Sequence, residues 1–197
     1  MAQQLKLSVE CVLDVRNTVG ESPVWSARES ALYWVDILEA TIHRWEPASG
    51  AHRTWTLPAV VGSLGLRRRG GLVLAMRTGF HLFDLTSGAL TFVHHPEPDI
   101  ATNRLNDGKV SPDGRFWAGT MDDRPVKEET GRLYRLDPDG SCRCMGEGLI
   151  VSNGLERSST VPAVGRSRPA STALAASATT IARSSSRASI SRAGASC

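Results

Sequence analysis

Ser111-Pro-Asp-Gly-Arg-Phe-Trp-Ala-Gly-Thr120 joins a tight turn to a short apolar run, and this pairing recurs along the chain. Pro, Asp and Gly in its first four residues are typical of a β-turn. The run Phe116–Thr120 has the length and composition expected of a β-strand. Two similar turns, Ser26-Ala-Arg-Glu-Ser30 and Arg67-Arg-Arg-Gly-Gly71, also separate strand candidates, so that the turns recur about every 42 residues.

A second set of turns follows the same rhythm. It consists of Glu46-Pro-Ala-Ser-Gly50, Asp84-Leu-Thr-Ser-Gly88 and Asp137-Pro-Asp-Gly140. Each suits a tight hairpin, because Gly supplies a positive φ at little steric cost. A unit of about 40–50 residues with four strands is typical of propeller blades. The repeat therefore favours an all-β propeller over the alternative, a β-sandwich with coincidental turn spacing.

Short runs rich in aromatic and β-branched residues are the predicted strands, and no stretch keeps a helical apolar period over ten residues. They are Val9–Val15, Ser22–Trp25, Ala31–Ile37, Ile42–Glu46, Leu72–Met76, His81–Leu85, Leu90–Val93, Phe116–Thr120 and Arg132–Asp137. Residues 9–155 thus hold about three blades, and Leu149–Leu155 begins a fourth. Propellers normally close with about 4–8 blades, so we expect this chain to be a shortened propeller.

The last part of the chain differs in composition from the rest. Residues 156–197 contain eleven Ser, ten Ala and six Arg, no aromatic residue, and a single acid, Glu156. Residues 1–155 carry 17 basic and 19 acidic side chains, so the formal net charge of +3 comes from the tail. Small polar residues bury too little apolar surface to offset their ordering entropy. We predict that 156–197 is disordered, and the overall charge indicates no basic binding surface on the folded part.

Several classes of protein are disfavoured by composition. No apolar run approaches the ~18 residues of a spanning helix, which argues against a membrane protein. The N-terminus shows no secretory signal. The four cysteines form no C-x-x-C pair, which argues against a zinc ribbon or a disulfide framework. The sequence therefore predicts a soluble, cytoplasmic protein.

Three stretches rich in acids and amides recur near one position of the blades. They are Gly20-Glu-Ser-Pro-Val-Trp25, Asn103-Arg-Leu-Asn-Asp-Gly-Lys109 and Ser152-Asn-Gly-Leu155. Glu21 and Asn106 are 85 residues apart, and Asn106 and Asn153 are 47 apart, about two blades and one blade. Such residues would converge on the propeller axis. Carboxylate and amide oxygens suit a hard divalent cation, with Ca²⁺ as the first choice.

Each stretch also has a plainer interpretation. Glu21 could be a solvated loop acid, Asn106-Asp-Gly108 is a good turn sequence, and Asn153-Gly154 is typical of a type I′ turn. His94-His95 could suggest a transition-metal site, but the Pro-rich residues after it favour a loop. Taken singly, none of these motifs is specific.

Together the motifs resemble the SMP-30/gluconolactonase family, which includes the regucalcin-like proteins. They are Glu21-Ser-Pro-Val-Trp25, Leu32-Tyr-Trp-Val-Asp-Ile37, Asn106-Asp-Gly-Lys-Val110, Gly114-Arg-Phe-Trp-Ala-Gly-Thr-Met121 and Ser152-Asn-Gly-Leu155. The resemblance covers about residues 9–155, in order. It implies half of a six-bladed propeller whose family hydrolyses sugar lactones with one divalent metal in the central channel, as part of carbohydrate metabolism.

The resemblance also assigns roles to particular residues. Glu21 and Asn153 match the metal-binding glutamate and asparagine of the family. Arg104 and Asn106 match its substrate-binding pair. Ca²⁺ is favoured, and Zn²⁺, Mg²⁺, Mn²⁺ or Fe²⁺ would suit the same oxygens. The expected partner is a sugar lactone, which the metal would polarise and Arg104 would orient during hydrolysis to the aldonic acid.

The chain departs from the family pattern at two places. A further substrate contact of the family aligns with Arg124, which puts that contact in doubt. The third metal ligand, an aspartate that is also the general base, would fall beyond Cys197, so the chain contains no catalytic residue of this kind and turnover could be lost. Resemblance stops after Leu155, and the Ser/Ala/Arg-rich residues that follow suggest an out-of-frame segment, with a natural short variant as the alternative.

Two other functional classes remain open. The blades could form a non-catalytic module that binds calcium or associates with another chain through an open sheet edge. The six arginines of the tail could meet phosphates, but no aromatic residue is interleaved to stack on bases, which disfavours nucleic-acid binding.

Overall fold

The computed structural model describes residues 10–157 and 174–178, and these contain strands and turns but no helix. The all-β prediction is confirmed. No helix long and apolar enough to cross a membrane occurs in these residues. The first sheet consists of β1 (Gly20–Ser26), β2 (Ala31–Asp36), β3 (Thr41–Trp45) and β4 (His52–Thr56).

The next sheets repeat the same antiparallel order. The second contains β5 (Val61–Leu66), β6 (Leu72–Met76), β7 (Gly79–Phe83) and β8 (Leu90–His94). The third contains β9 (Asn103–Val110), β10 (Phe116–Asp122), β11 (Gly131–Leu136) and β12 (Cys142–Leu149). A two-stranded ladder of β13 (Ser152–Arg157) and β14 (Leu174–Ala178) follows. Sequential strands pair in every sheet, which is the meander of a propeller blade.

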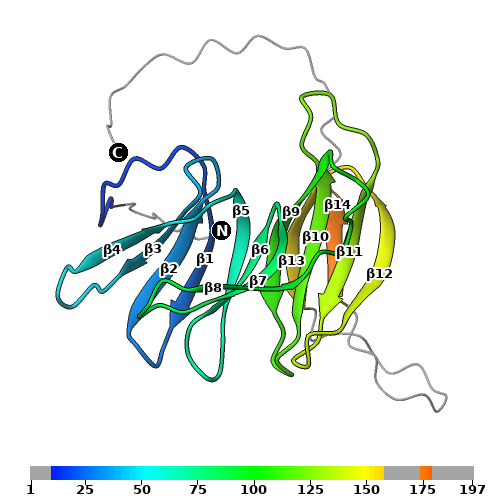
Figure 1. The fold of residues 1–197 in the computed structure, drawn as a ribbon. Helices are drawn as coiled ribbons and strands as arrows, with labels where there is room; N and C mark the ends of the chain where they lie inside the picture. Colours follow the sequence, from blue (N-terminus) through cyan, green and yellow to red (C-terminus); the bar gives the residue numbers. More distant parts are fainter. Residues whose placement is uncertain (1–9, 158–173, 179–197) are drawn as a thin grey trace, which may run out of the picture.

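The first strands of successive sheets lie against one another. β1 contacts β5, β5 contacts β9, and β9 contacts β13. Figure 1 shows the sheets side by side, with β5 between β1 and β9. The first strands therefore line a common region, and the later strands of each sheet lie farther out.

The apolar core forms in layers between the sheets. On β6 all five residues are buried, and Leu72, Leu74 and Met76 join one core cluster with Tyr33 and Ile42 of the first sheet. The alternate residues, Val73 and Ala75, join a second cluster that includes Phe116 and Tyr134 of the third sheet. Because side chains alternate along a strand, one sheet contributes to two cores.

The turns behave as their sequences predict. Gly50, Gly88 and Gly140 have φ values of 71°, 73° and 87°, in the left-handed region that glycine favours. The backbone N–H of Gly114 donates to the carbonyl of Ser111 at 2.8 Å, which closes the turn between β9 and β10. The repeated turns therefore separate strands at equivalent positions of the three sheets.

Some strand predictions were wrong. Residues 10–15 of the predicted strand Val9–Val15 are not in a strand; Val12 is 65% exposed, and no neighbouring strand pairs with this segment. Four strands of the first three sheets were missed, namely β4, β5, β9 and β12. β5 and β9 contain glycines and amides that resemble turn residues, and most residues of β4 and β12 are exposed or only partly buried. Their pairing is set by neighbouring strands, which local composition does not reveal.

The predicted disordered tail, 156–197, lies largely outside the described residues. Within it, Leu174–Ala178 forms β14, which pairs with β13, so this short segment differs from the prediction.

Candidate active site

Each first strand contains one residue more than the strand that pairs with it. The extra residue lies between Glu21 and Val24 of β1, Val61 and Ser63 of β5, Leu105 and Gly108 of β9, and Asn153 and Glu156 of β13. Such β-bulges bend a strand and re-aim its side chains. The bulge thus marks the same level in all four first strands.

The predicted ligands occupy equivalent positions at this level. Glu21 and Asn153 each directly precede the bulge, and so does Leu105 on β9. Asn106 is therefore one residue later than the position that the spacing suggested. Because neighbouring residues of a strand point in opposite directions, this offset gives Asn106 a different surrounding from Glu21 and Asn153.

Asn106 is buried and links two first strands. Its Nδ2 donates to the carbonyl oxygen of Ser152 at 2.8 Å, and its Oδ1 accepts from Nη1 of Arg104 at 2.7 Å. The adjacent Asp107 accepts from the backbone N–H groups of Gly154 and Leu155 at 2.8 and 3.2 Å. Asn106 and Asp107 together fasten β9 to β13 and fix the bulge beside Asn153.

Neither suspected turn in these stretches is a hairpin turn. Asn106-Asp-Gly108 lies within β9, and Asn153-Gly154 lies within β13. Gly154 has a φ of 67°, so it does adopt the left-handed conformation that the turn interpretation required. The bulge uses this conformation inside a strand, which explains why a turn-like sequence was misleading.

Arg104 is held by acceptors on three sides. Its Nε donates to Oδ1 of Asp123 at 2.7 Å, and its Nη1 donates to Asn106 and to the carbonyl of Leu105. The side chain is 11% exposed. Among the described residues, no acceptor contacts its Nη2, so one edge of the guanidinium keeps a free donor.

Asp123 is a site residue that the sequence did not assign. It forms ion pairs with Arg104 from the third sheet and with Arg77, which follows β6 of the second sheet. One carboxylate between two guanidinium groups leaves a net positive charge. The one available signal was the position of Asp123 directly after the Gly-Thr-Met strand.

Arg124 is turned back onto the protein. Asp122 is fully buried and accepts from the backbone N–H, the Nε and the Nη2 of Arg124, at 2.7–3.1 Å. The Arg124 side chain holds the pKa of the Asp122 carboxyl well below its usual value, with further N–H donation from Arg124 and Glu128. Arg124 therefore organises the loop after β10.

Glu21 lies just after a firmly held segment. Asp36, 1% exposed, accepts from the N–H groups of Thr18 and Val19 at 2.6 and 3.0 Å and from Asn17. Burial would raise the pKa of Asp36, but these hydrogen bonds outweigh it and lower the pKa. The backbone that leads into β1 is therefore fixed, while Glu21 itself is exposed.

The oxygens of Glu21 and Asn153 remain available to a ligand. Among the described residues, Glu21 has no hydrogen-bond or ion-pair partner, and Oδ1 of Asn153 accepts only from the N–H of Gly154, at 3.0 Å. A carboxylate and an amide oxygen fit a hard divalent cation in kind. Within 10–157 and 174–178, however, no three His, Cys, Asp or Glu side chains gather as a metal-binding group.

The loop predicted at His94-His95 begins one residue later than expected, at His95. His94 ends β8, and Nδ1 of His95 accepts from the N–H of Glu97 at 3.2 Å. Glu97 is buried and accepts from the side chains of Asn103, Thr120 and Tyr134, so this loop anchors the start of β9. This structural role of Glu97 was not apparent from the sequence.

Comparison with known proteins shows which family this chain resembles. Residues 19–160 match the family model described as the SMP-30/Gluconolactonase/LRE-like region. The chain is 39% identical over 148 residues to 6-deoxy-6-sulfogluconolactonase of Pseudomonas putida, covering 75% of this chain and 50% of that protein. It is 38% identical over 154 residues to regucalcin of Xenopus laevis, covering 76% and 52%.

A solved structure shares the fold. The calcium-binding protein regucalcin from Agrobacterium tumefaciens superposes with a TM-score of 0.68 and 27% identity, covering 73% of this chain and 48% of that one. The chain thus spans about half the length of the relatives it matches.

Proposed function

Because the chain belongs to the SMP-30/gluconolactonase/LRE-like family, we propose that this protein hydrolyses the ring ester of a sugar lactone to the aldonic acid. The observation that carries the proposal is the Arg104 guanidinium, held by Asp123 and Asn106 with one donor edge free. A fixed guanidinium can orient a sugar and stabilise negative charge that develops on a carbonyl oxygen. Hydrolases named for sugar lactones are among the relatives of this chain.

Glu21 and Asn153 are the residues that would hold a divalent cation. When bound, such an ion supplies Lewis-acid polarisation of the lactone carbonyl. Ca²⁺ is our first choice because both donors are hard oxygens and because a relative is named a calcium-binding protein. Zn²⁺, Mg²⁺, Mn²⁺ and Fe²⁺ are the other candidates.

The described residues account for binding and orientation better than for proton transfer. The last aspartate of the sequence is Asp139, so none follows Asn153, where the family pattern has its general base. A positioned base typically contributes ~10²–10⁴ in rate. We therefore assign binding and orientation of the lactone, and not proton transfer, to the residues of this chain named above.

A second candidate is a non-catalytic module that binds a cation or another copy of the chain. It is favoured by the exposure of the two oxygen donors, Glu21 and Asn153. Cation binding without lactone opening, or self-association that rises with concentration, would support this function. Metal-dependent lactone opening would exclude it.

The test is hydrolysis of glucono-1,5-lactone by the purified chain, measured by acid release above the spontaneous rate. We expect activity to require added divalent cation and to fall at least about tenfold in Arg104→Gln and Glu21→Gln. Glu10→Gln, which changes an exposed acid outside the site, is the matched control. Equal rates in all four proteins would refute the proposed function.

A further inference from the structure

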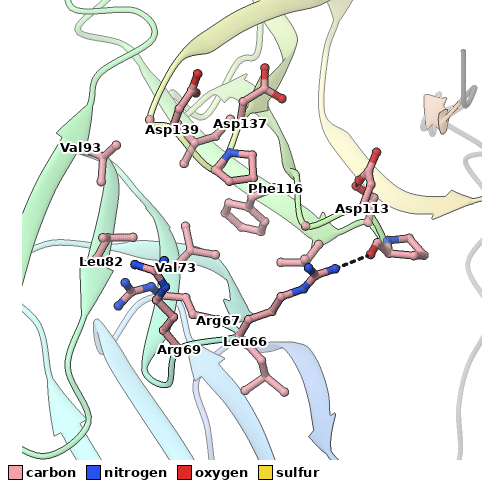
Figure 2. A pocket seen from close by; sticks show the side chains of 18 residues that line it. Leu66, Arg67, Arg69, Val73, Leu82, Val93, Asp113, Phe116, Asp137 and Asp139 are labelled. Carbon is pink, nitrogen blue, oxygen red and sulfur yellow. Dashed lines mark hydrogen bonds between the residues drawn. The ribbon is translucent and has the colours of Figure 1, made fainter.

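A cavity of about 710 Å³ lies between the second and third sheets, away from the candidate active site. It is surrounded by the turns that join β5 to β6, β9 to β10 and β11 to β12 (Figure 2). Val110 lines it at one end of β9, and Arg104 lies six residues away, about 20 Å along the strand. The two sites are therefore separate, and the cavity has the size of a small-molecule pocket.

One wall of the cavity is apolar. Figure 2 shows Val73, Leu82 and Val93 of the second sheet on one side and Phe116 of the third sheet on the other. Leu82 and Val93 pack against the core cluster that contains Phe116, but they are only partly buried. The cluster is thus open toward the cavity and could accept an apolar group.

Three arginines lie at the rim of the cavity, and two of them have no hydrogen-bond or ion-pair partner among the described residues. Arg68 donates to the carbonyl of Pro112 at 3.2 Å, across the cavity from its own turn. Among the described residues, the guanidinium groups of Arg67 and Arg69 have no hydrogen-bond or ion-pair partner, and both lie beside the apolar wall in Figure 2. The cavity therefore presents two positive charges next to apolar side chains.

Two of the three acids around the same cavity are paired with arginines, and the third is hydrogen-bonded. Asp137 pairs with Arg115 and Arg135, each at 2.9 Å. Asp113 pairs with Arg115 and accepts from Ser111, and Asp139 accepts from the N–H and hydroxyl of Ser141 at 2.9 and 2.7 Å. Three lining arginines thus face one acid without an ion pair, Asp139, so the net charge around the cavity is positive.

We propose that this cavity binds a small amphiphilic anion, such as a medium-chain carboxylate. The carboxylate pairs with Arg67 and Arg69, because a guanidinium presents parallel N–H donors that match its two oxygens. The apolar chain lies against Leu82 and Val93, which are only partly buried, and removes their exposed surface from water. A neutral or cationic molecule of the same shape lacks the first of these interactions.

The test is calorimetric titration of the full chain with octanoate, octan-1-ol and octylamine. Binding of these compounds does not depend on lactone hydrolysis, so the result is independent of the proposed function. We expect one saturable octanoate site per chain and binding of the other two to be at least about tenfold weaker. Arg67→Gln/Arg69→Gln should weaken octanoate binding by a similar factor. Arg16→Gln/Arg53→Gln, which removes two positive charges elsewhere, should leave it unchanged, with circular dichroism confirming the fold of both variants.

Three results would overturn the proposal. They are no saturable octanoate binding by the folded chain, equal binding of octanoate and octan-1-ol, and unchanged octanoate binding in Arg67→Gln/Arg69→Gln. As a second probe of position, Val93→Asp should abolish octanoate binding, because it places a negative charge against the apolar wall.

Discussion

The contact between the first two sheets is mainly apolar, whereas the contact between β9 and β13 that is described above is polar. Between the first two sheets, thirteen buried apolar residues form one cluster, and the hydroxyl of Ser22, which accepts from the N–H of Leu64, adds a polar link. Between β9 and β13, Asn106 and Asp107 bond the backbone of Ser152, Gly154 and Leu155. Apolar packing supplies stability, whereas the polar contact fixes the backbone beside proposed site residues.

The apolar contact should show the largest effect on stability. Leu74 is fully buried in the first cluster, so Leu74→Ala removes apolar contacts and leaves a cavity. We expect a loss of about 2–5 kcal/mol in the free energy of unfolding, measured by urea denaturation. Leu38→Ala, at a leucine that is 61% exposed, should change stability by less than about 0.5 kcal/mol. Similar losses at both positions would contradict the packing described above.

The contact between β5 and β9 depends on the absence of a side chain at one position. A Cβ at Gly62 would lie 2.5 and 2.6 Å from the carbonyl oxygens of Leu105 and Asn106. Gly62→Ala should therefore push the two strands apart, at a cost of about 1–3 kcal/mol in unfolding free energy.

Gly146 provides the matched control for this substitution. A Cβ there meets nothing within 4 Å, and its φ is not positive, so Gly146→Ala should be neutral or slightly stabilising. Thermal unfolding of both variants tests the difference. A Gly62→Ala protein as stable as Gly146→Ala would show that β5 and β9 are not packed this closely.

The polar contact should have a smaller effect on stability and a local effect on structure. Asp107→Ala removes the acceptor of the Gly154 and Leu155 N–H groups, for which we expect about 1 kcal/mol. Hydrogen exchange of those two amides should accelerate, while the amides of β2 should keep their protection. Asp14→Ala, at an exposed acid outside β9, is the control.

Asp122 predicts a modest dependence of stability on pH. Its folded-state pKa is lowered by Arg124, so its contribution is present above the unfolded pKa and is lost as pH falls through the folded value. The unfolded pKa of Asp is about 3.9, so the loss should begin as pH falls below about 4. Asp122→Asn should weaken this acid dependence, measured as Tm between pH 2 and 6. Identical pH profiles of Tm for the unsubstituted protein and Asp122→Asn would show that Asp122 does not cause this acid dependence.

Much of the fold could be predicted because the turns contain residues that are characteristic of turns. Gly50, Gly88 and Gly140 indicated equivalent hairpins, and each has the positive φ that its turn requires. The first strands β5 and β9 were harder to predict, since glycines and amides occupy strand interiors where another backbone approaches closely. Local propensity assigns such residues to turns, and only the neighbouring strand reverses that assignment.

The candidate site could be predicted in part. Glu21, Arg104 and Asn153 were found from motifs, and they lie on three first strands near equivalent bulges. The pairing of Asp123 with Arg104 and Arg77 was not predictable, because the two arginines belong to different sheets. The offset of Asn106 was also hidden, since a bulge adds one residue without changing the motif.

The most direct test of the proposed cation site is a double-mutant cycle for Ca²⁺ binding, measured by calorimetry on the full chain. If Glu21 and Asn153 bind the same ion, Glu21→Gln and Asn153→Ala should each raise Kd by at least about tenfold. The loss of binding free energy in the double variant should then be smaller than the sum of the two single losses, because each residue contributes less to binding the ion once the other has been removed. Unchanged Kd in either single variant, or strictly additive effects, would contradict convergence of β1 and β13 on one cation.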